Sequence, residues 1–290
     1  MVYPAAARGR KVDELSWYAE RFRTVEVNVS FYRPLTTAMT RGWVQRTPPG
    51  FEFAVKLHQQ FTHPAGLGPD PRGPAVPDVS ASDVTAWLEG LAPLAEAARL
   101  GPLLAQFPAG FHATPETEGY LAWLLEALRP LPVAVELRHR SWSDRQADVW
   151  PLLDASDAAW TLIDEPKFSS SVFQSTALAR EAVSTRGWSY IRLHGRNAAQ
   201  WWQPPTSEDR YNYLYSDEEL TPFAEIAEAA RALGRKLYLY ANNHFGGNAV
   251  ANAAQLRARL DDPVRAPFPR TFVERFPGIE EVVETEPALF

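Results

Sequence analysis

Short apolar runs alternate with longer amphipathic segments along most of the chain. The short runs are rich in β-branched and aromatic residues, which favours strands at 25–29, 51–57, 103–107, 133–137, 160–163, 190–193 and 237–241. Apolar residues recur at helical spacing near 36–46, 81–99, 115–129, 144–155, 172–183, 217–233 and 249–260. Strands that alternate with helices predict parallel βαβ units and therefore an α/β fold.

Two of the predicted helices carry local start signals. Ser216 followed by Glu219 makes a capping box, in which each side chain accepts a hydrogen bond from the other residue's backbone N–H. Thr114 precedes Pro115, which places a proline at the first helical position, where a backbone N–H has no partner to lose. These signals support helix starts at 217 and 115.

Within the strands, apolar and polar side chains alternate. In the strand at 133–137 the larger apolar residues share one face, and Glu136 and Arg138 lie on the other. In the penultimate strand, isoleucine and leucine oppose Arg192 and His194. An open parallel sheet covered on both faces consists of apolar runs, so solvent on the polar face is one alternative. A closed (β/α) barrel of the TIM type is the interpretation that we favour, with its polar side chains pointing inward near the mouth.

The predicted strands are about seven, and the chain opens with a helix at 12–22. An eight-stranded barrel requires one more strand before residue 10, so the barrel apparently lacks its first strand. Either a gap remains there or the tail after residue 261 covers it. We therefore expect a barrel domain over 1–260 and a proline-rich C-terminal extension over 261–290.

Composition narrows the class of protein. The 290 residues carry a formal net charge of -6, which disfavours unselective binding to a polyanion. Cysteine is absent, which excludes disulfides and thiolate chemistry and fits a cytoplasmic location. The N-terminus shows no apolar signal-peptide core, and no stretch is apolar over the length of a membrane span. Oligomeric state is not indicated.

Polar side chains stand at or just beyond the ends of separate strands, which converge at one mouth in a barrel. His194, Glu136 and Asp164 are the predicted catalytic residues, because imidazole and carboxylate groups exchange protons near neutral pH. The predicted substrate-binding residues are Glu26, Asn28, Tyr32, Lys56, Gln106, Arg138, Arg196, Trp201, Trp202, Asn242 and Asn243. Two structural alternatives stay open, namely an ion pair of Glu26 with Arg138 and a core role for His194. His244 is expected to line the mouth, and the remaining histidines, His58, His63, His112 and His139, are expected in loops or at the surface.

Other chemistry has weaker support. A metal site would have to draw its ligands from separate strands, as Glu136, Asp164 and His194. We predict no metal or other cofactor. No glycine-rich phosphate loop and no nucleophile elbow occurs. The loop after His194 holds Trp201-Trp202 and three tyrosines, which either stack on a ring of the ligand or pack on the rim.

Several segments resemble the YecE-like family, a domain-of-unknown-function family (number seventy-two). They are Val25-Glu26-Val27-Asn28 with Ser30-Phe31-Tyr32-Arg33, Trp43 through Arg46-Thr47-Pro48, Gly50-Phe51 with Phe53-Ala54-Val55-Lys56 and Thr62-His63, Gly101-Pro102-Leu103-Leu104 with Gln106-Phe107-Pro108, Val135-Glu136 with Arg138-His139-Arg140-Ser141-Trp142, Arg192-Leu193-His194-Gly195-Arg196, Tyr215-Ser216 and Asn242-Asn243. The resemblance runs in order from about residue 12 to 260 and implies a TIM-type barrel, without an activity.

The chain departs from the family pattern in two places. Members usually begin with a strand that ends in a Gly-Thr-Ser-Gly-Trp-like motif, and this chain starts after it. Ala241 and His244 stand where the family usually has Phe and Asp around the asparagine pair. Both departures affect walls of the expected pocket.

Three functions fit these observations. The first is an enzyme, such as a hydrolase or lyase, that needs no metal and acts on a small polar, anionic substrate. Arg138, Arg196 and Lys56 bind the anion in this hypothesis, and His194 and Glu136 exchange protons. The second is a protein that binds single-stranded or damaged nucleic acid through Trp201 and Trp202. The third is an inactive barrel remnant.

Overall fold

The computed structural model describes residues 2–3, 12–64, 76–175, 187–206 and 208–287. The chain forms two compact units. Unit 1 comprises Met1–Phe22, Ile163–Lys167 and Ser175–Phe290, and unit 2 comprises Arg23–Leu162 and Phe168–Gln174. Each unit contains strands and helices of its own.

Unit 2 is built on a parallel sheet of five strands in the order β1-β2-β3-β4-β5. The strands are β1 (Thr24–Val27), β2 (Glu52–Lys56), β3 (Leu100–Gln106), β4 (Val133–Glu136) and β5 (Ala159–Trp160). Each strand pairs with the next in the sequence, so the carboxyl ends of β1 to β4 follow one another along one edge. The register places Gln106 beside Glu136 at that edge.

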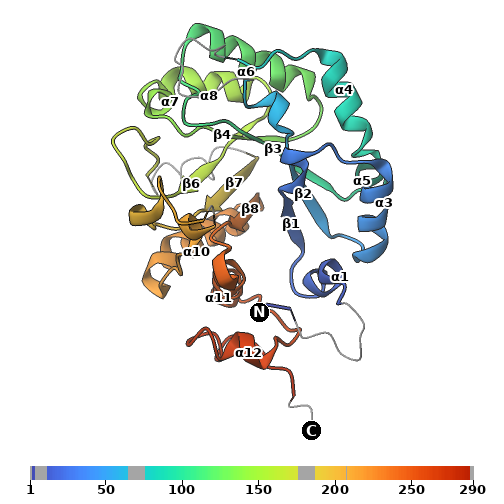
Figure 1. Cartoon of the computed structure of the whole chain (residues 1–290), viewed down its shortest axis with the longest axis vertical. Coiled ribbons are helices and arrows are strands. Elements are labelled where there is room, and N and C mark those ends of the chain that lie inside the picture. Colours follow the sequence, from blue (N-terminus) through green and yellow to red (C-terminus); the bar gives the residue numbers. More distant parts are fainter. Residues whose placement is uncertain (1, 4–11, 65–75, 176–186, 207, 288–290) are drawn as a thin grey trace. The chain divides into compact units, whose positions relative to one another are not determined.

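Helices connect these strands, and Figure 1 shows α3, α5 and α6 on the same side of the sheet. The helices are α2 (Val29–Tyr32), α3 (Thr37–Arg46), α4 (Ala81–Glu89), α5 (Ala92–Glu96), α6 (Pro115–Ala127), α7 (Arg140–Asp144) and α8 (Gln146–Asp154), with a 3-10 turn at Gln59–Phe61. The predicted start at Thr114-Pro115 is confirmed, because Thr114 caps α6 and accepts from the backbone of Thr117.

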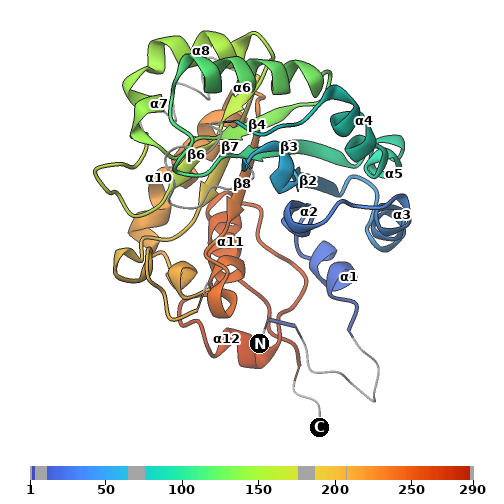
Figure 2. The ribbon, with the colours of Figure 1, turned by 45° about the horizontal axis from the view of Figure 1, so that its top comes forward.

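Unit 1 has a sheet of three strands in the order β6-β7-β8. The strands are β6 (Leu162–Asp164), β7 (Trp188–Leu193) and β8 (Lys236–Ala241), and β7 and β8 run parallel. Helices α10 (Asp217–Ala232) and α11 (Asn248–Arg259) both contact β8, as Figure 2 shows. Ser216 and Glu219 form the predicted capping box at the start of α10.

An apolar cluster of unit 1 joins the two ends of the described chain. It brings α1 (Glu14–Ala19) and α11 together with the segment that contains α12 (Arg270–Val273). Arg21 lies over the ring of Trp17 at 3.6 Å from its centroid and also faces Phe268. Its guanidinium donates to the backbone carbonyl groups of Trp17 and Pro267. The residues after 263 therefore contribute to the core of unit 1, and the predicted boundary at 260 stays a prediction.

The predicted α/β class with parallel strands is confirmed, and a strand lies at each predicted position. One prediction is corrected, because the run at 160–163 is not a single strand. Thr161 N–H still donates to Val135 of β4 at 2.8 Å, whereas Asp164 O accepts from His194 at the end of β7 at 2.8 Å. The run therefore divides between two sheets. The predicted helix at 172–183 lies largely outside the described residues, and the short helix α7 was not predicted.

The polar face of the strands is buried. Glu136 and His194 are fully buried, and Arg192 and Lys56 are nearly so. Solvent on that face, the alternative weighed above, therefore does not explain the alternation of side chains. Charged groups in such places require partners close by.

Candidate functional site

Glu136 and Arg138 form a close ion pair at the carboxyl end of β4. Arg138 directs its Nε to Glu136 Oε1 at 2.7 Å and its Nη2 to the same oxygen at 2.6 Å. The carboxylate is fully buried, and the guanidinium is slightly exposed. This pair therefore supplies a buried carboxylate and a guanidinium, whose planar fork suits carboxylate and phosphate groups.

Lys56 ends strand β2, which β3 separates from β4, and is nearly buried. Its Nζ lies 4.0 Å from the ring centroid of Phe31, and His63 meets the same ring edge-on at 4.9 Å. Burial, together with the positive charges of Lys56 and Arg138, lowers the pKa of His63 to about 4. Two cations and a neutral imidazole thus gather at one edge of the unit 2 sheet. Histidine 63 was expected in a loop, and its place in this group was not predicted.

The end of β1 adds a polar pair to unit 2. Asn28, the residue before α2, donates from Nδ2 to Glu26 Oε1 at 3.1 Å. Tyr32 ends the same helix with most of its side chain in solvent. The strand order and register place Glu26, Lys56, Gln106 and Glu136 at the carboxyl ends of four consecutive strands, as the sequence predicted.

A stacked pair of histidines lies just beyond β3 and β4. The rings of His112 and His139 are 3.8 Å apart between centroids. The Nδ1 atom of His139 accepts from Ser141 N–H at 3.1 Å, and Ser141 Oγ accepts from Ala113 N–H at 2.8 Å. Burial, followed by the neighbouring His112, lowers the pKa of His139. Because donors occupy Nδ1, the neutral ring carries its proton on Nε2, the reverse of what a metal ligand at Nε2 requires.

In unit 1, His194 follows β7 and is fully buried. Its Nδ1 lies 3.0 Å from Asn242 Nδ2, and its Nε2 lies 3.5 Å from Arg192 Nη1. Two residues of the predicted site, His194 and Asn242, are therefore in contact. This arrangement fixes the plane of the imidazole within the β7–β8 pair.

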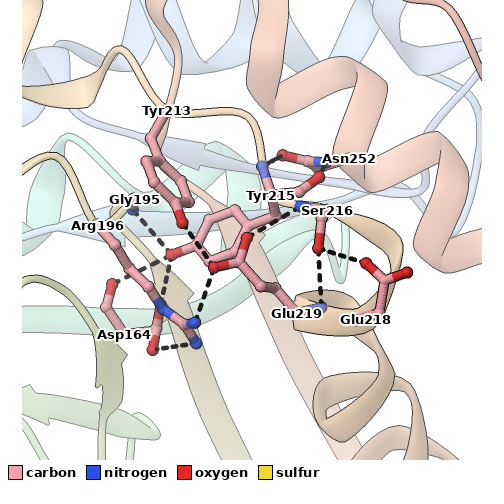
Figure 3. A network of polar contacts seen from close by, with 9 residues as sticks. All are labelled: Asp164, Gly195, Arg196, Tyr213, Tyr215, Ser216, Glu218, Glu219 and Asn252. Carbon is pink, nitrogen blue, oxygen red and sulfur yellow. Dashed lines mark hydrogen bonds and ion pairs between the residues drawn. The ribbon is translucent and has the colours of Figure 1, made fainter.

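A network of polar contacts holds the turn that follows His194 (Figure 3). Arg196 donates from Nε to Asp164 Oδ2 at 2.8 Å and from Nη2 to Asp164 Oδ1 at 3.1 Å, a bidentate pair. Tyr215 donates its hydroxyl proton to Asp164 Oδ2 at 2.7 Å and accepts from Gly195 N–H at 2.9 Å. Burial and the adjacent Asp164 charge raise the pKa of Tyr215 strongly, so its phenol stays protonated. The network joins β6, the end of β7 and the loop before α10.

Glu219 extends this network to α10. Its Oε1 accepts from Arg196 Nη1 at 3.0 Å and from the Tyr213 hydroxyl at 2.6 Å, while Oε2 accepts from Ser216 N–H. Burial and then Glu219 raise the pKa of Tyr213 to about 12. Burial acts to raise the pKa of Glu219. The net shift is downward, because Glu219 accepts hydrogen bonds from Tyr213 and Ser216 and lies beside the positive charge of Arg196. Glu219 was predicted only as a cap, and its link to Arg196 was missed.

Asparagine amides hold the backbone of the same loop. Asn252 of α11 accepts from Tyr215 N–H at 3.1 Å and donates to Tyr215 O at 3.0 Å. Asn243 donates to Tyr213 O at 2.8 Å and to Asn252 Oδ1 at 2.8 Å. Asn197 donates to two further carbonyl groups of the loop. The loop between β7 and α10 is thereby fixed along its length, although no sequence pattern marked Asn252.

The aromatic side chains of this loop differ in exposure. Trp201 is 5% exposed and meets the rings of His194 and Tyr211 edge-on, at 6.4 and 6.2 Å between centroids. Trp202 is 61% exposed. Tyr215 is buried and packs against Tyr213, which fits the packing role considered for both tyrosines. Only Trp202 of the two tryptophans presents a large exposed surface.

Within the described ranges, no group of three or more histidine, aspartate or glutamate side chains has the geometry to hold a metal ion. Over the same ranges, no helix combines the length and apolar character that crossing a bilayer demands.

Taken together, these features define an α/β protein of parallel sheets with its polar side chains at the carboxyl ends of the strands. A family model described as "Protein of unknown function DUF72" matches residues 1–273, and the chain belongs to this family, for which YecE-like is another name. The UPF0759 protein YunF of Bacillus subtilis is 27% identical over 266 residues, which make up 90% of each chain.

Two solved structures of DUF72 family proteins are similar to this chain. One, from Enterococcus faecalis, has a TM-score of 0.73 and 26% identity, covering 87% of this chain and 90% of that chain. The other, from Thermotoga maritima, has a TM-score of 0.69 and 32% identity, covering 84% of this chain and 87% of that chain. The similarity supports the α/β fold described above.

Proposed function

We propose that this protein is an enzyme for a small anionic substrate, which Lys56 and Arg138 bind at the carboxyl ends of β2 and β4. The observation that carries the proposal is the convergence of these two cations on the half-buried His63 imidazole. Carboxylate and phosphate groups are the natural partners of a guanidinium beside an ammonium group. The closed barrel and the single shared rim expected from the sequence stay predictions.

Glu136 is the proton-transfer group in this proposal. Its buried carboxylate is held by Arg138 at the same strand ends as the two cations. A fixed carboxylate next to a bound anion is placed to take a proton from the substrate and return it, which serves hydrolysis and elimination alike. His194 is the corresponding acid–base candidate at the strand ends of unit 1, where Asn242 orients its ring.

Asp164 and Arg196 take a positioning role in the proposal. They bind each other through two hydrogen bonds, and Tyr215 and Glu219 engage them further. Because Asp164 and Arg196 are engaged by each other and by the loop, their contacts favour a role in fixing the loop after His194 over a role in binding the substrate. Base stacking by the tryptophans has less support, because Trp201 is buried and the net charge is -6.

Anion binding tests the proposal directly. Titration with acetate and with sulfate at pH 6, followed by amide NMR shifts, is expected to perturb residues at the ends of β2 and β4. Lys56→Met keeps the alkyl stem and removes the charge, so it should weaken binding by about tenfold, the worth of one charge-assisted hydrogen bond of roughly 1.5 kcal/mol.

Arg140→Gln is the matched control. Arg140 lies two residues beyond Arg138, but its side chain is exposed and pairs with Asp144. Its loss should leave affinity within about twofold, because exposed ion pairs and charges are screened by solvent. An affinity that Lys56→Met leaves unchanged, or no binding of either anion by the unaltered chain, contradicts the proposal.

A further inference from the structure

The charges at the carboxyl ends of β1, β2 and β4 balance one another. Lys56 and Arg138 supply two positive charges, and Glu26 and Glu136 supply two negative ones. Lys56 and Glu136 are buried or nearly so, and the Arg138 side chain is only 17% exposed. Since uncompensated charge is costly in such surroundings, an anion that enters this group needs a positive charge to accompany it.

His63 is placed to supply that charge. Its Nδ1 lies 2.9 Å from Thr62 Oγ1, and its ring packs edge-on against the ring of Phe31. The Lys56 ammonium lies over the same Phe31 ring. The charged groups that act on the imidazole are Lys56 at the end of β2 and Arg138 beyond β4. Burial and these two cations lower the pKa of His63, which keeps the ring neutral at pH 7 while no anion is near.

We infer that the substrate anion enters together with one proton, which His63 takes up, and that this anion is a monocarboxylate. The inference rests on the proposed function and specifies its ligand. One negative charge on the ligand and one positive charge on the imidazole leave the strand ends neutral, as before. A dianion would leave one negative charge uncompensated in a half-buried site.

The coupling has a definite sign and size. The pKa of His63 is about 4 without a ligand, and an adjacent carboxylate raises it. Between these two values, each bound anion takes up one proton, so the affinity falls as the pH rises, by as much as tenfold per pH unit. Above the raised pKa the ring stays neutral in both states, and the affinity becomes independent of pH.

Acetate binding to the full chain, measured by calorimetry from pH 5.5 to 8.5 in buffers of different ionisation enthalpy, tests the inference. We expect an uptake approaching one proton per acetate at pH 5.5 and an affinity that decreases with rising pH. His63→Gln should abolish the uptake and flatten the pH profile. His58→Gln removes a nearby histidine, and both effects should persist in that variant. Sulfate, a dianion throughout this range, should bind more weakly than acetate.

The outcomes separate the inference from the proposed function. Acetate binding without proton uptake, or with an uptake that persists in His63→Gln, overturns the coupling and leaves the anion site intact. Tighter binding of sulfate than of acetate overturns the assignment to monocarboxylates. Failure of the unaltered chain to bind either anion at pH 5.5 overturns the proposed function itself. Imidazole NMR shifts of His63 report its protonation independently of calorimetry.

Discussion

At the scale of the residue, the hydroxyl group of Tyr215 is the contact on which three segments depend. It accepts a hydrogen bond from Gly195 N–H and donates one to the Asp164 carboxylate, and Tyr215 as a whole is 1% exposed. Water cannot easily replace a hydroxyl in such a place. The cost of its removal is therefore set by the polar groups left without a partner.

Tyr215→Phe should lower the free energy of unfolding by about 1–3 kcal/mol, because a buried N–H and a carboxylate oxygen each lose a hydrogen bond. Tyr213→Phe is the matched control, since its hydroxyl bonds only Glu219 among the described residues and its side chain is partly exposed. We expect less than about 1 kcal/mol for the control. Equal losses in urea denaturation would show that burial of Tyr215 has no special weight.

At the scale of the element, the turn that follows β7 requires a glycine at position 195. Gly195 has φ +89°, and a Cβ atom there would lie 2.7 Å from the Tyr213 Cβ. Gly234, after α10, also has a positive φ of +63° but has open space around it. The two positions separate backbone strain from steric overlap.

Gly195→Ala should destabilise the protein clearly more than Gly234→Ala. The left-handed conformation costs about 1–2 kcal/mol at either position, and only Gly195 adds an overlap that displaces Tyr213 and its bond to Glu219. Thermal unfolding of the two variants measures the difference. A loss at Gly195 no greater than at Gly234 would mean that the loop adjusts at no cost.

The elements that the sequence predicted best are those defined by local patterns. The capping box at Ser216 and the helix start at Thr114-Pro115 were predictable because the capping hydrogen bonds span only three residues, and a proline at the first helical position gives up no hydrogen bond. Alternation along β4 and β7 correctly predicted the buried polar positions Glu136 and His194. The links from Glu219 to Arg196 and from Asn252 to Tyr215 join residues 23 and 37 positions apart, which no local pattern records.

At the scale of the whole molecule, the alternation of strands and helices predicted the α/β class. The same alternation does not determine whether the sheet closes into a barrel. Net charge was a poor guide to the site. A chain of charge -6 still gathers Lys56 and Arg138 around one imidazole, because a sum over 290 residues conceals local groupings. His63 was accordingly missed, since its neighbours come from separate strands.

The apolar cluster of α1, α11 and the segment after 263 gives a prediction for unit 1 as a whole. Phe272→Ala should cost about 3–5 kcal/mol, because Phe272 is fully buried among Phe268, Phe276 and their neighbours. Leu233→Ala, at a residue that is 52% exposed, should cost less than about 0.5 kcal/mol. Chemical denaturation measures both. A small loss for Phe272 would show that the segment after 263 adds little to stability.

The amide of Asn252 gives Tyr215 both a donor and an acceptor, and its oxygen also receives the Asn243 amide. Hydrolysis of that amide to a carboxylate, the common chemical ageing of asparagine, would replace the donor with an oxygen that faces the Tyr215 carbonyl oxygen. Attraction would become repulsion at a buried position. The order of the loop that carries Arg196 thus depends on one nitrogen atom of α11, which is far from the loop in the sequence.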